Sequence, residues 1–114
     1  MLSQKYRLTR KKDFEKIFKK GKKLKEDFLI LAIAKNNLNR ARFGFIVSQK
    51  VSKKAAIRNK IKRRLREITQ TKLNKIQKGI DIVFVALPGL EKKDFWEIKK
   101  ITNKLFQKTK CLKV

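Results

Sequence analysis

A run of basic residues with no acid among them is the part of this chain best suited to a chemical task. Residues 50–66 read KVSKKAAIRNKIKRRLR and hold nine Lys or Arg. A basic face that is merely solvated normally carries Glu at i±4 to pair with its cations, and none occurs before Glu67. On a helix, at about 100° per residue, one continuous arc holds Arg58, Asn59, Lys62, Arg63 and Arg66.

Phosphate is the ligand that suits this arc best. Planar guanidinium groups pair bidentately with phosphate oxygens, and an asparagine amide can add a hydrogen bond. The chain as a whole has 34 Lys and Arg against 9 Asp and Glu, and this formal net charge of +25 steers it toward polyanions. We therefore predict nucleic-acid binding. The predicted contact residues are Lys50, Lys53, Lys54, Arg58, Asn59, Lys60, Lys62, Arg63 and Arg66.

Covalent chemistry by the chain itself is not predicted. The sequence has no histidine, the usual general base and metal ligand, and no two of its acids are spaced to hold metal ions. A glycine-rich phosphate loop and a Ser or Cys nucleophile with its base are also missing. We therefore predict no catalytic residue, no metal site and no cofactor bound by the protein. Asp13/Glu15 and Asp94/Glu97 are interpreted as neutralising the starts of lysine-rich helices.

A hydrophobic core must hold the basic arc in place, and the composition provides one. Hydrophobic residues make up 41% of the 114 residues and include eight Phe, enough for the core of one domain. A stripe at i, i+4, i+8 and i+11 predicts that the basic helix packs one side against that core. This stripe consists of Ile57, Ile61, Leu65 and Ile68.

The remaining patterns predict a single α+β domain over residues 1–114, with the element order αβββαβα and a small mixed sheet. The first helix is expected to follow Thr9 as N-cap and to stop at Gly21. The basic helix is expected to start near residue 54, with Ser52 as a possible cap. The other predicted elements are a short edge strand at 22–25, strands at 28–34, 42–48 and 81–87, a turn at Asn36–Asn39, and a last helix at about 92–108.

Phe14 and Phe18 allow two interpretations. They lie 40° apart on the first helix, so both can be core residues. Alternatively, they line a groove and stack on unpaired bases, which a single-stranded ligand permits and a duplex does not. The pattern alone leaves both interpretations open.

The single cysteine and the lengths of the apolar runs indicate the cellular compartment of the protein. Cys111 cannot form an internal disulfide, which favours a reducing cytoplasm, and no role is predicted for it. The longest apolar run, residues 28–34, is far too short to span a membrane. A transit peptide is disfavoured, because Asp13 and Glu15 interrupt the basic N-terminal segment and Gly21 closes it as an ordinary helix.

Three motifs in this chain resemble the protein subunit of bacterial ribonuclease P. Residues 58–67, RNKIKRRLRE, resemble the RNR motif of that family, and residues 47–51, VSQKV, precede it like the family's V-S-x-K-V segment. Asp13-Phe14, Phe18 and Gly21 resemble its D-F-x-x-[VI]-F-x-x-G helix. Residues 81–83 followed by an amphipathic helix complete a likeness that covers essentially the whole chain.

The resemblance implies a protein partner of a catalytic RNA that removes the 5′ leader from precursor tRNA. The RNA would perform the hydrolysis with bound magnesium, and the implied partners are the catalytic RNA and precursor tRNA, with neither DNA nor a membrane. The RNR helix would lie against the catalytic RNA. A cleft between the first helix and the sheet would hold the single-stranded leader, with Phe14 and Phe18 in it. The family fold also has a left-handed β-α-β crossover, where the general rule for parallel strands is right-handed.

Three positions depart from the family pattern. Lys60 replaces the second Arg of the motif, which keeps the charge and loses the planar fork. Ser52 stands where Gly is usual, and Leu31 aligns where some members carry Tyr on the leader-facing side of the sheet.

Three other functions fit parts of the pattern. A ribosomal-type structural RNA-binding protein would share the basic α+β build. A DNA-binding regulator would need a helix-turn-helix partner for the basic helix. A membrane-active amphipathic protein would not need the two strongly apolar strands.

Overall fold

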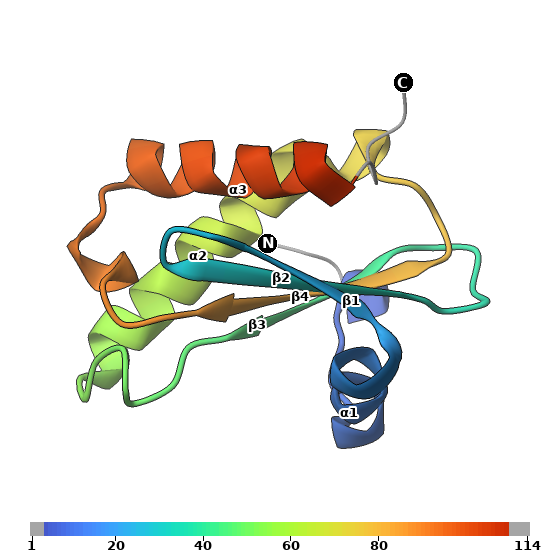
Figure 1. The fold of residues 1–114 in the computed structure, drawn as a ribbon, viewed down its shortest axis with the longest axis horizontal. Helices are drawn as coiled ribbons and strands as arrows, with labels where there is room; N and C mark the ends of the chain where they lie inside the picture. Colours follow the sequence, from blue (N-terminus) through green and yellow to red (C-terminus); the bar gives the residue numbers. More distant parts are fainter. Residues whose placement is uncertain (1–3, 110–114) are drawn as a thin grey trace.

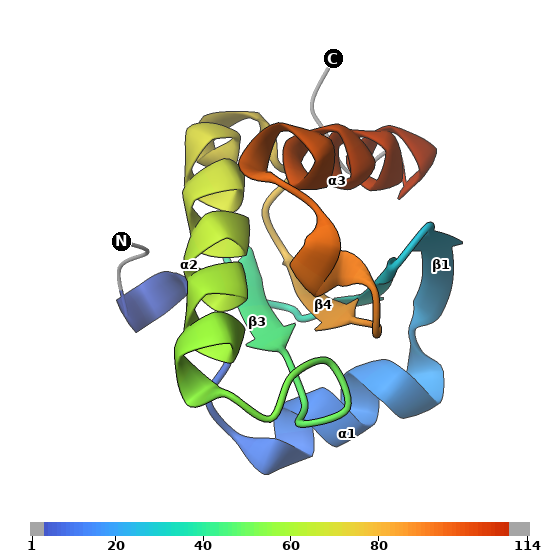
Figure 2. The same ribbon diagram turned by 90° about the vertical axis from the view of Figure 1, so that its left-hand side faces the viewer.

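The protein is described by a computed structural model in which residues 4–109 are placed. A four-stranded mixed sheet carries α2 and α3 on one face and α1 on the other (Figures 1 and 2). The strand order is β1-β2-β4-β3, with β1–β2 and β2–β4 antiparallel and β3–β4 parallel. The helices and strands are α1 (Lys11–Lys20), β1 (Lys22–Glu26), β2 (Leu29–Lys35), β3 (Arg42–Ile46), α2 (Ala55–Thr71), β4 (Ile80–Ala86) and α3 (Phe95–Thr109), with 3₁₀ turns η1 (Gln4–Tyr6), η2 (Leu73–Lys75) and η3 (Leu90–Lys92).

This confirms the predicted order of helices and strands, the edge strand included. The two proposed N-caps are wrong. Arg10 occupies the N-cap of α1 and Lys54 that of α2, and neither position has a side-chain cap. Thr9 lies one residue too early, and Ser52 Oγ accepts a hydrogen bond from the Lys54 amide at 3.2 Å in the preceding turn. The stop at Gly21 is confirmed, since its amide donates to the Ile17 carbonyl oxygen at 2.8 Å.

The last helix begins later than predicted because a capping box sets its start. Asp94 Oδ1 accepts from the Glu97 amide at 2.9 Å, and Glu97 Oε1 accepts from the Asp94 amide at 3.2 Å. The two carboxylates therefore do stabilise a helix start, as expected, but that start is Phe95. Residues 90–92 form the separate turn η3. Phe28, predicted to open the second strand, precedes β2 and is exposed.

Two hydrophobic clusters of very different size occupy the two faces of the sheet. The larger cluster lies under α2 and α3 and includes Ile61, Leu65 and Ile68, so the predicted core stripe of α2 is confirmed. Within it the Phe84 ring stacks on Phe45, with centroids 5.9 Å apart, and meets the edge of Phe106 at 5.6 Å. The smaller cluster lies under α1 and has four buried residues, Leu8, Ile17, Ala32 and Val83.

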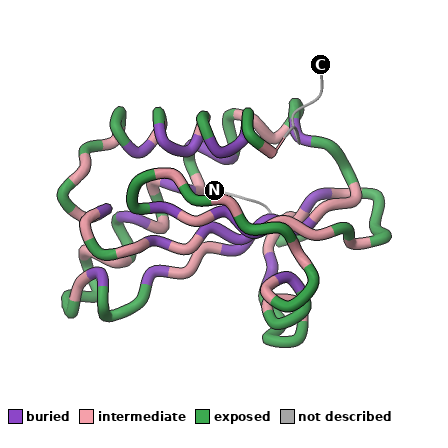
Figure 3. The backbone as a smooth tube through the Cα atoms, viewed as in Figure 1, coloured by how far each residue is buried: buried purple, intermediate pink, exposed green. Residues whose placement is uncertain are grey.

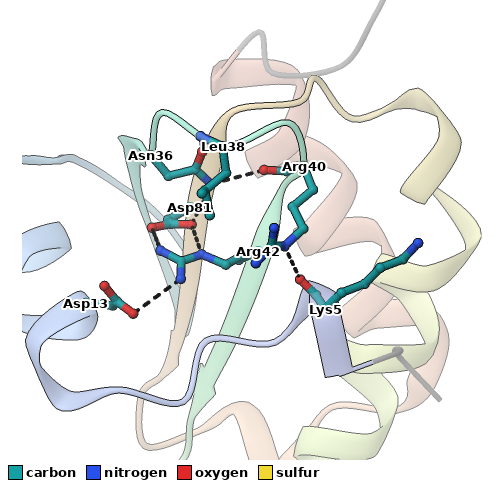
Figure 4. A network of polar contacts seen from close by, with 7 residues as sticks. All are labelled: Lys5, Asp13, Asn36, Leu38, Arg40, Arg42 and Asp81. Atoms are coloured by element: carbon teal, nitrogen blue, oxygen red, sulfur yellow. Dashed lines mark hydrogen bonds and ion pairs between the residues drawn. The ribbon is translucent and has the colours of Figure 1, made fainter.

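A network of partly buried charged groups fixes α1 to the end of the sheet (Figure 4). Asp81, at the start of β4, accepts two hydrogen bonds from the Arg42 guanidinium, at 2.9 and 2.8 Å. Arg42 Nη1 also reaches Asp13 of α1 at 3.3 Å, and Asn36 Nδ2 donates to Asp81 at 2.8 Å. The hydrogen bonds with Asp81 raise the pKa of Arg42 further above its ordinary value. These contacts join α1 to β3, to β4 and to the turn between β2 and β3.

The basic helix connects two neighbouring parallel strands, since α2 follows β3 and precedes β4. This is the β-α-β unit expected from the sequence. The left-handed sense of the crossover stays a prediction from the family resemblance.

Candidate nucleic-acid interface

The outer side of α2 presents the predicted basic arc to solvent. Asn59 and Arg63 of that arc are exposed and its other three members are partly buried, whereas Ile61 and Leu65 are fully buried on the side toward the core. A shallow depression of about 300 Å³ runs along this side and is lined by Asn59, Arg63, Arg66, Glu67 and Gln70. The helix therefore holds two arginines and an amide along one groove, as the wheel predicted.

The four arginines of α2 are not equivalent. Arg58 Nη1 donates to the carbonyl oxygens of Ser52 and Lys53, both at 3.0 Å, and so ties the helix to the loop before it. Arg64 Nη1 reaches the Lys93 carbonyl oxygen at 3.3 Å, on the side toward α3. Arg66 Nε donates to the Lys62 carbonyl oxygen within the helix, and no hydrogen bond to the Arg63 side chain occurs within residues 4–109.

The loop before α2 holds three more predicted contact residues on a fixed backbone. Lys50, Lys53 and Lys54 are all exposed. Ser48 Oγ accepts from the Lys50 amide at 3.3 Å, and the buried Val51 anchors the loop to the core. The three lysines thus extend the basic surface of α2 beyond its N-terminus.

The α1 face of the sheet gives Phe14 and Phe18 intermediate environments. Both side chains are half-buried, and both pack on the smaller cluster beside Ile46 and Val85. The Phe14 ring lies over Gly44 of β3, where an added Cβ would come within 2.5 Å of the ring. Lys23 Nζ lies 5.7 Å from the centroid of the Phe18 ring. The two rings are therefore neither fully buried in the core nor fully exposed to solvent, and they border a partly exposed apolar strip of the sheet.

Leu31 does not lie on this face, so its assignment to the leader-facing side is wrong. Leu31 is fully buried in the larger cluster, under α2 and α3. Its neighbour Ala32 packs under α1 instead. A one-residue shift in the alignment exchanges the two faces of a strand, which explains the error.

No group of three or more His, Cys, Asp or Glu that could hold a metal ion occurs among residues 4–109. In the same part of the chain, no helix is both long enough and apolar enough to cross a bilayer. Cys111 lies outside the described residues.

Comparison with known proteins identifies the family. A family model described as Ribonuclease P matches residues 2–110. The ribonuclease P protein component of Syntrophomonas wolfei is 39% identical over 100 residues, which cover 88% of this chain and 83% of that protein. The corresponding component of Thermotoga maritima is 39% identical over 104 residues, covering 87% and 88%. The chain belongs to the ribonuclease P protein family.

Solved structures agree with that assignment. The RNase P protein of Staphylococcus aureus superposes with a TM-score of 0.88 at 27% identity, over 94% of this chain and 97% of that one. The RNase P protein of Thermotoga maritima gives a TM-score of 0.81 at 35% identity, over 90% and 96%. The α+β fold described above is thus the fold of ribonuclease P proteins, and this chain is a protein subunit of that endoribonuclease.

Sequence reasoning missed two features near these surfaces. The Arg42–Asp81 pair joins residues 39 positions apart, and no local pattern marks it. On the last helix, Trp96 is 71% exposed whereas Phe106 is fully buried. The apolar period of α3 runs through Ile98, Ile101 and Leu105 and leaves Trp96 outside it, a signal available in the sequence.

Proposed function

We propose that this protein binds the catalytic RNA of ribonuclease P and the 5′ leader of precursor tRNA, and thereby promotes endonucleolytic removal of the leader. The observation that carries this proposal is the basic outer side of α2, where Asn59, Arg63 and Arg66 line one groove on a helix anchored by Ile61 and Leu65. The spacing of its guanidinium groups suits a phosphate backbone. Membership of the ribonuclease P protein family supports the catalytic RNA of that enzyme as the partner.

The contacts on the catalytic RNA would come from the nine residues predicted from the sequence. Arg63 and Asn59 are the most available of them, since both are exposed and line the groove. Arg58 would act in two ways, because its guanidinium also holds the carbonyl oxygens of Ser52 and Lys53. Lys50, Lys53 and Lys54 would meet phosphates beyond the helix.

The leader would lie along the α1 face of the sheet. Phe14 and Phe18 border the apolar strip that Ile46 and Val85 form, and Lys23 lies above the Phe18 ring. Unpaired bases stack on aromatic rings and pack on apolar side chains, while a nearby ammonium group attracts the phosphates. A paired duplex could not use these rings, which favours a single-stranded ligand.

Hydrolysis would be carried out by the RNA with its own magnesium ions. The chain supplies no histidine, and in the described residues it supplies no acid cluster for a metal. Its contribution is to hold two RNAs in position relative to one another. Among the alternatives weighed from the sequence, family membership favours this one over a ribosomal-type RNA-binding protein.

Reconstitution tests the proposal directly. Protein freed of RNA by a ribonuclease, which is then removed, should not cleave precursor tRNA at any magnesium concentration. Adding the catalytic RNA should restore cleavage at the mature 5′ end, and the protein should raise the affinity for precursor over mature tRNA. Cleavage by the RNA-free protein, or equal affinity for the two tRNAs, would contradict it.

A further inference from the structure

The outward side of α3 carries an aromatic ring that packing does not explain. Trp96 is 71% exposed, far more than the other exposed large hydrophobic residues of the described chain, Phe28 at 37% and Leu38 at 36%. Its ring is nevertheless held in one orientation, because Phe95 meets it edge-on at 5.5 Å and Lys99 Nζ lies 5.4 Å from its centroid. An exposed, oriented indole is a stacking surface without a partner in this molecule.

Polar side chains of a particular kind surround that ring. A shallow depression of about 370 Å³ beside it is lined by Trp96, Lys99, Lys100, Asn103, Lys104 and Gln107. No acid lines it. Figure 3 shows this outer side of α3 exposed along its length, while the inner side is buried.

Two of the acids near this surface are paired, whereas a third, Asp27, lines a neighbouring depression together with Lys100 and Lys104 and forms no ion pair among the described residues. Glu97 lies 3.6 Å from Lys93 Nζ and closes the capping box of α3. Glu26 is paired with Lys104 and Lys108. Lys99 and Lys100 form no ion pair with any residue from 4 to 109, so their positive charge remains available to a ligand.

We propose that the outward side of α3 is a second RNA-binding surface, on which an unpaired nucleotide stacks on Trp96. Lys99 and Lys100 would meet its phosphates, and the exposed Gln107 would hydrogen-bond to its base edge. This surface lies on α3, across the sheet from α1, which carries Phe14 and Phe18, and on a different helix from the arc of α2 (Figure 2). The inference rests on the proposed function, because it assumes that the protein works within an RNA complex.

RNA fits this surface better than a protein or a membrane does. A protein partner would be expected to bury a wider apolar patch, and among residues 4–109 Trp96 is the only one with an apolar side chain that lines the depression. A helix that binds a bilayer turns its apolar face outward, whereas Ile98, Ile101 and Leu105 face the core here. One aromatic ring among lysines and amides matches a base and its phosphate.

The chain provides its own reporter, because Trp96 is its single tryptophan. The experiment adds an oligouridylate of about eight nucleotides, within the size range of single-strand sites, to the full-length protein and follows tryptophan fluorescence. We expect saturable quenching and reduced access of acrylamide to the indole. A blunt RNA duplex of the same length should quench much less. Unchanged fluorescence while the oligonucleotide binds, measured by anisotropy of a label on it, would overturn the inference and leave the proposed function intact.

Variants locate the effect on α3. Trp96→Ala should weaken oligouridylate binding about 5- to 150-fold, the equivalent of one stacked base, without changing the melting temperature, since the side chain is exposed.

Lys100→Ala should weaken the quenching transition, whereas Lys75→Ala, which removes the same charge from η2, should not. Equal loss for both lysine variants would show a general charge effect and overturn the inference. Failure of the wild-type protein to bind either the oligouridylate or the catalytic RNA would refute the proposed function as well. Quenching by vesicles of anionic phospholipid, with none by RNA, would assign the surface to a membrane.

Discussion

The two faces of the sheet differ in how completely they are covered. On the face under α2 and α3, Phe43, Phe84 and Phe106 are each at most 1% exposed and belong to one continuous core. On the face under α1, the hydrophobic cluster of the described residues has only four fully buried members, and the aromatic rings at its edge remain half-exposed. The first face therefore carries the stability of the fold. The second is held in place by the Arg42 ion pairs and keeps apolar surface available to a ligand.

The largest effect should come from truncating the fully covered face. Leu65→Ala removes a side chain with 0% exposure from between α2 and the sheet, and should lower the free energy of unfolding by about 2–5 kcal/mol. Ile46→Ala, on the half-covered face, should cost only about 1–2 kcal/mol, because that side chain already contacts solvent. Urea denaturation of both variants measures the difference. Equal costs would show that the two faces share one core.

A second, smaller effect separates the outer side of α2 from its inner side. Arg63→Ala and Arg66→Ala should each weaken binding to the catalytic RNA by about 1–3 kcal/mol, with a salt dependence smaller by about one unit per lost phosphate contact. Arg58→Ala should in addition lower the melting temperature, because it releases the carbonyl oxygens of Ser52 and Lys53.

Arg64→Ala is the matched control for these variants. It removes the same group from the same helix, but that guanidinium contacts the Lys93 carbonyl oxygen beside α3. Filter binding across a series of salt concentrations should show that the Arg64→Ala protein binds the catalytic RNA with nearly the affinity of the wild type. If Arg64→Ala weakens RNA binding as much as Arg63→Ala does, the basic arc has been assigned to the wrong side of α2.

The half-covered face should show its role through leader length. Phe14→Ala and Phe18→Ala should each weaken binding of precursor tRNA to the holoenzyme by about 1–3 kcal/mol per stacked base. That loss should appear with a leader of about six nucleotides and not with a leader of one. Thermal unfolding must be followed in parallel, because packing on Ile17 and Val83 predicts some destabilisation too. Equal loss for both leaders, or lower stability with the leader preference intact, would make both rings core residues only.

Periodicity and turn chemistry were sufficient for most of this fold. The stripe through Ile61, Leu65 and Ile68 fixed which side of α2 is buried, and hence which side could meet RNA. The asparagine-rich turn was also predicted correctly. It forms with Asn37 at φ 57° and with Asn36 Oδ1 accepting from the Leu38 amide. These features depend on residues close together in the sequence.

The errors and omissions depend on contacts between distant residues. Leu31 was assigned to the wrong face because alternation along a buried strand that is apolar on both sides gives no sign of which face is which. The inward turn of Arg64 depends on a carbonyl group 29 positions away. The bidentate pair of Arg42 and Asp81 depends on β3 lying parallel to β4. No local pattern reports such pairings.

The smallest predicted effect concerns the edge of the well-covered face, where Glu26 of β1 joins the C-terminal half of α3. Its carboxylate accepts a hydrogen bond from Lys108 and lies 3.8 Å from Lys104. The hydrogen bond with Lys108, helped by the charges of both lysines, lowers the pKa of Glu26 below its ordinary 4.5. A carboxylate with a depressed folded-state pKa stabilises the fold fully above the unfolded-state pKa, and that contribution is lost as the pH falls through the folded-state value.

Glu26→Gln should therefore lower the melting temperature slightly at about pH 7, and this difference should disappear as the pH falls through the lowered folded-state pKa of the wild-type carboxyl. The effect stays small because the ammonium groups of both lysines are open to solvent and exchange these contacts for water. Adding salt at about pH 7 should shrink the difference further, since exposed charges are screened. The measurement is the difference in melting temperature between the two proteins across the acid range. A difference that stays the same across the whole acid range would mean that Gln disturbs the packing of β1 against α3, and that the ion pairs contribute nothing to this edge.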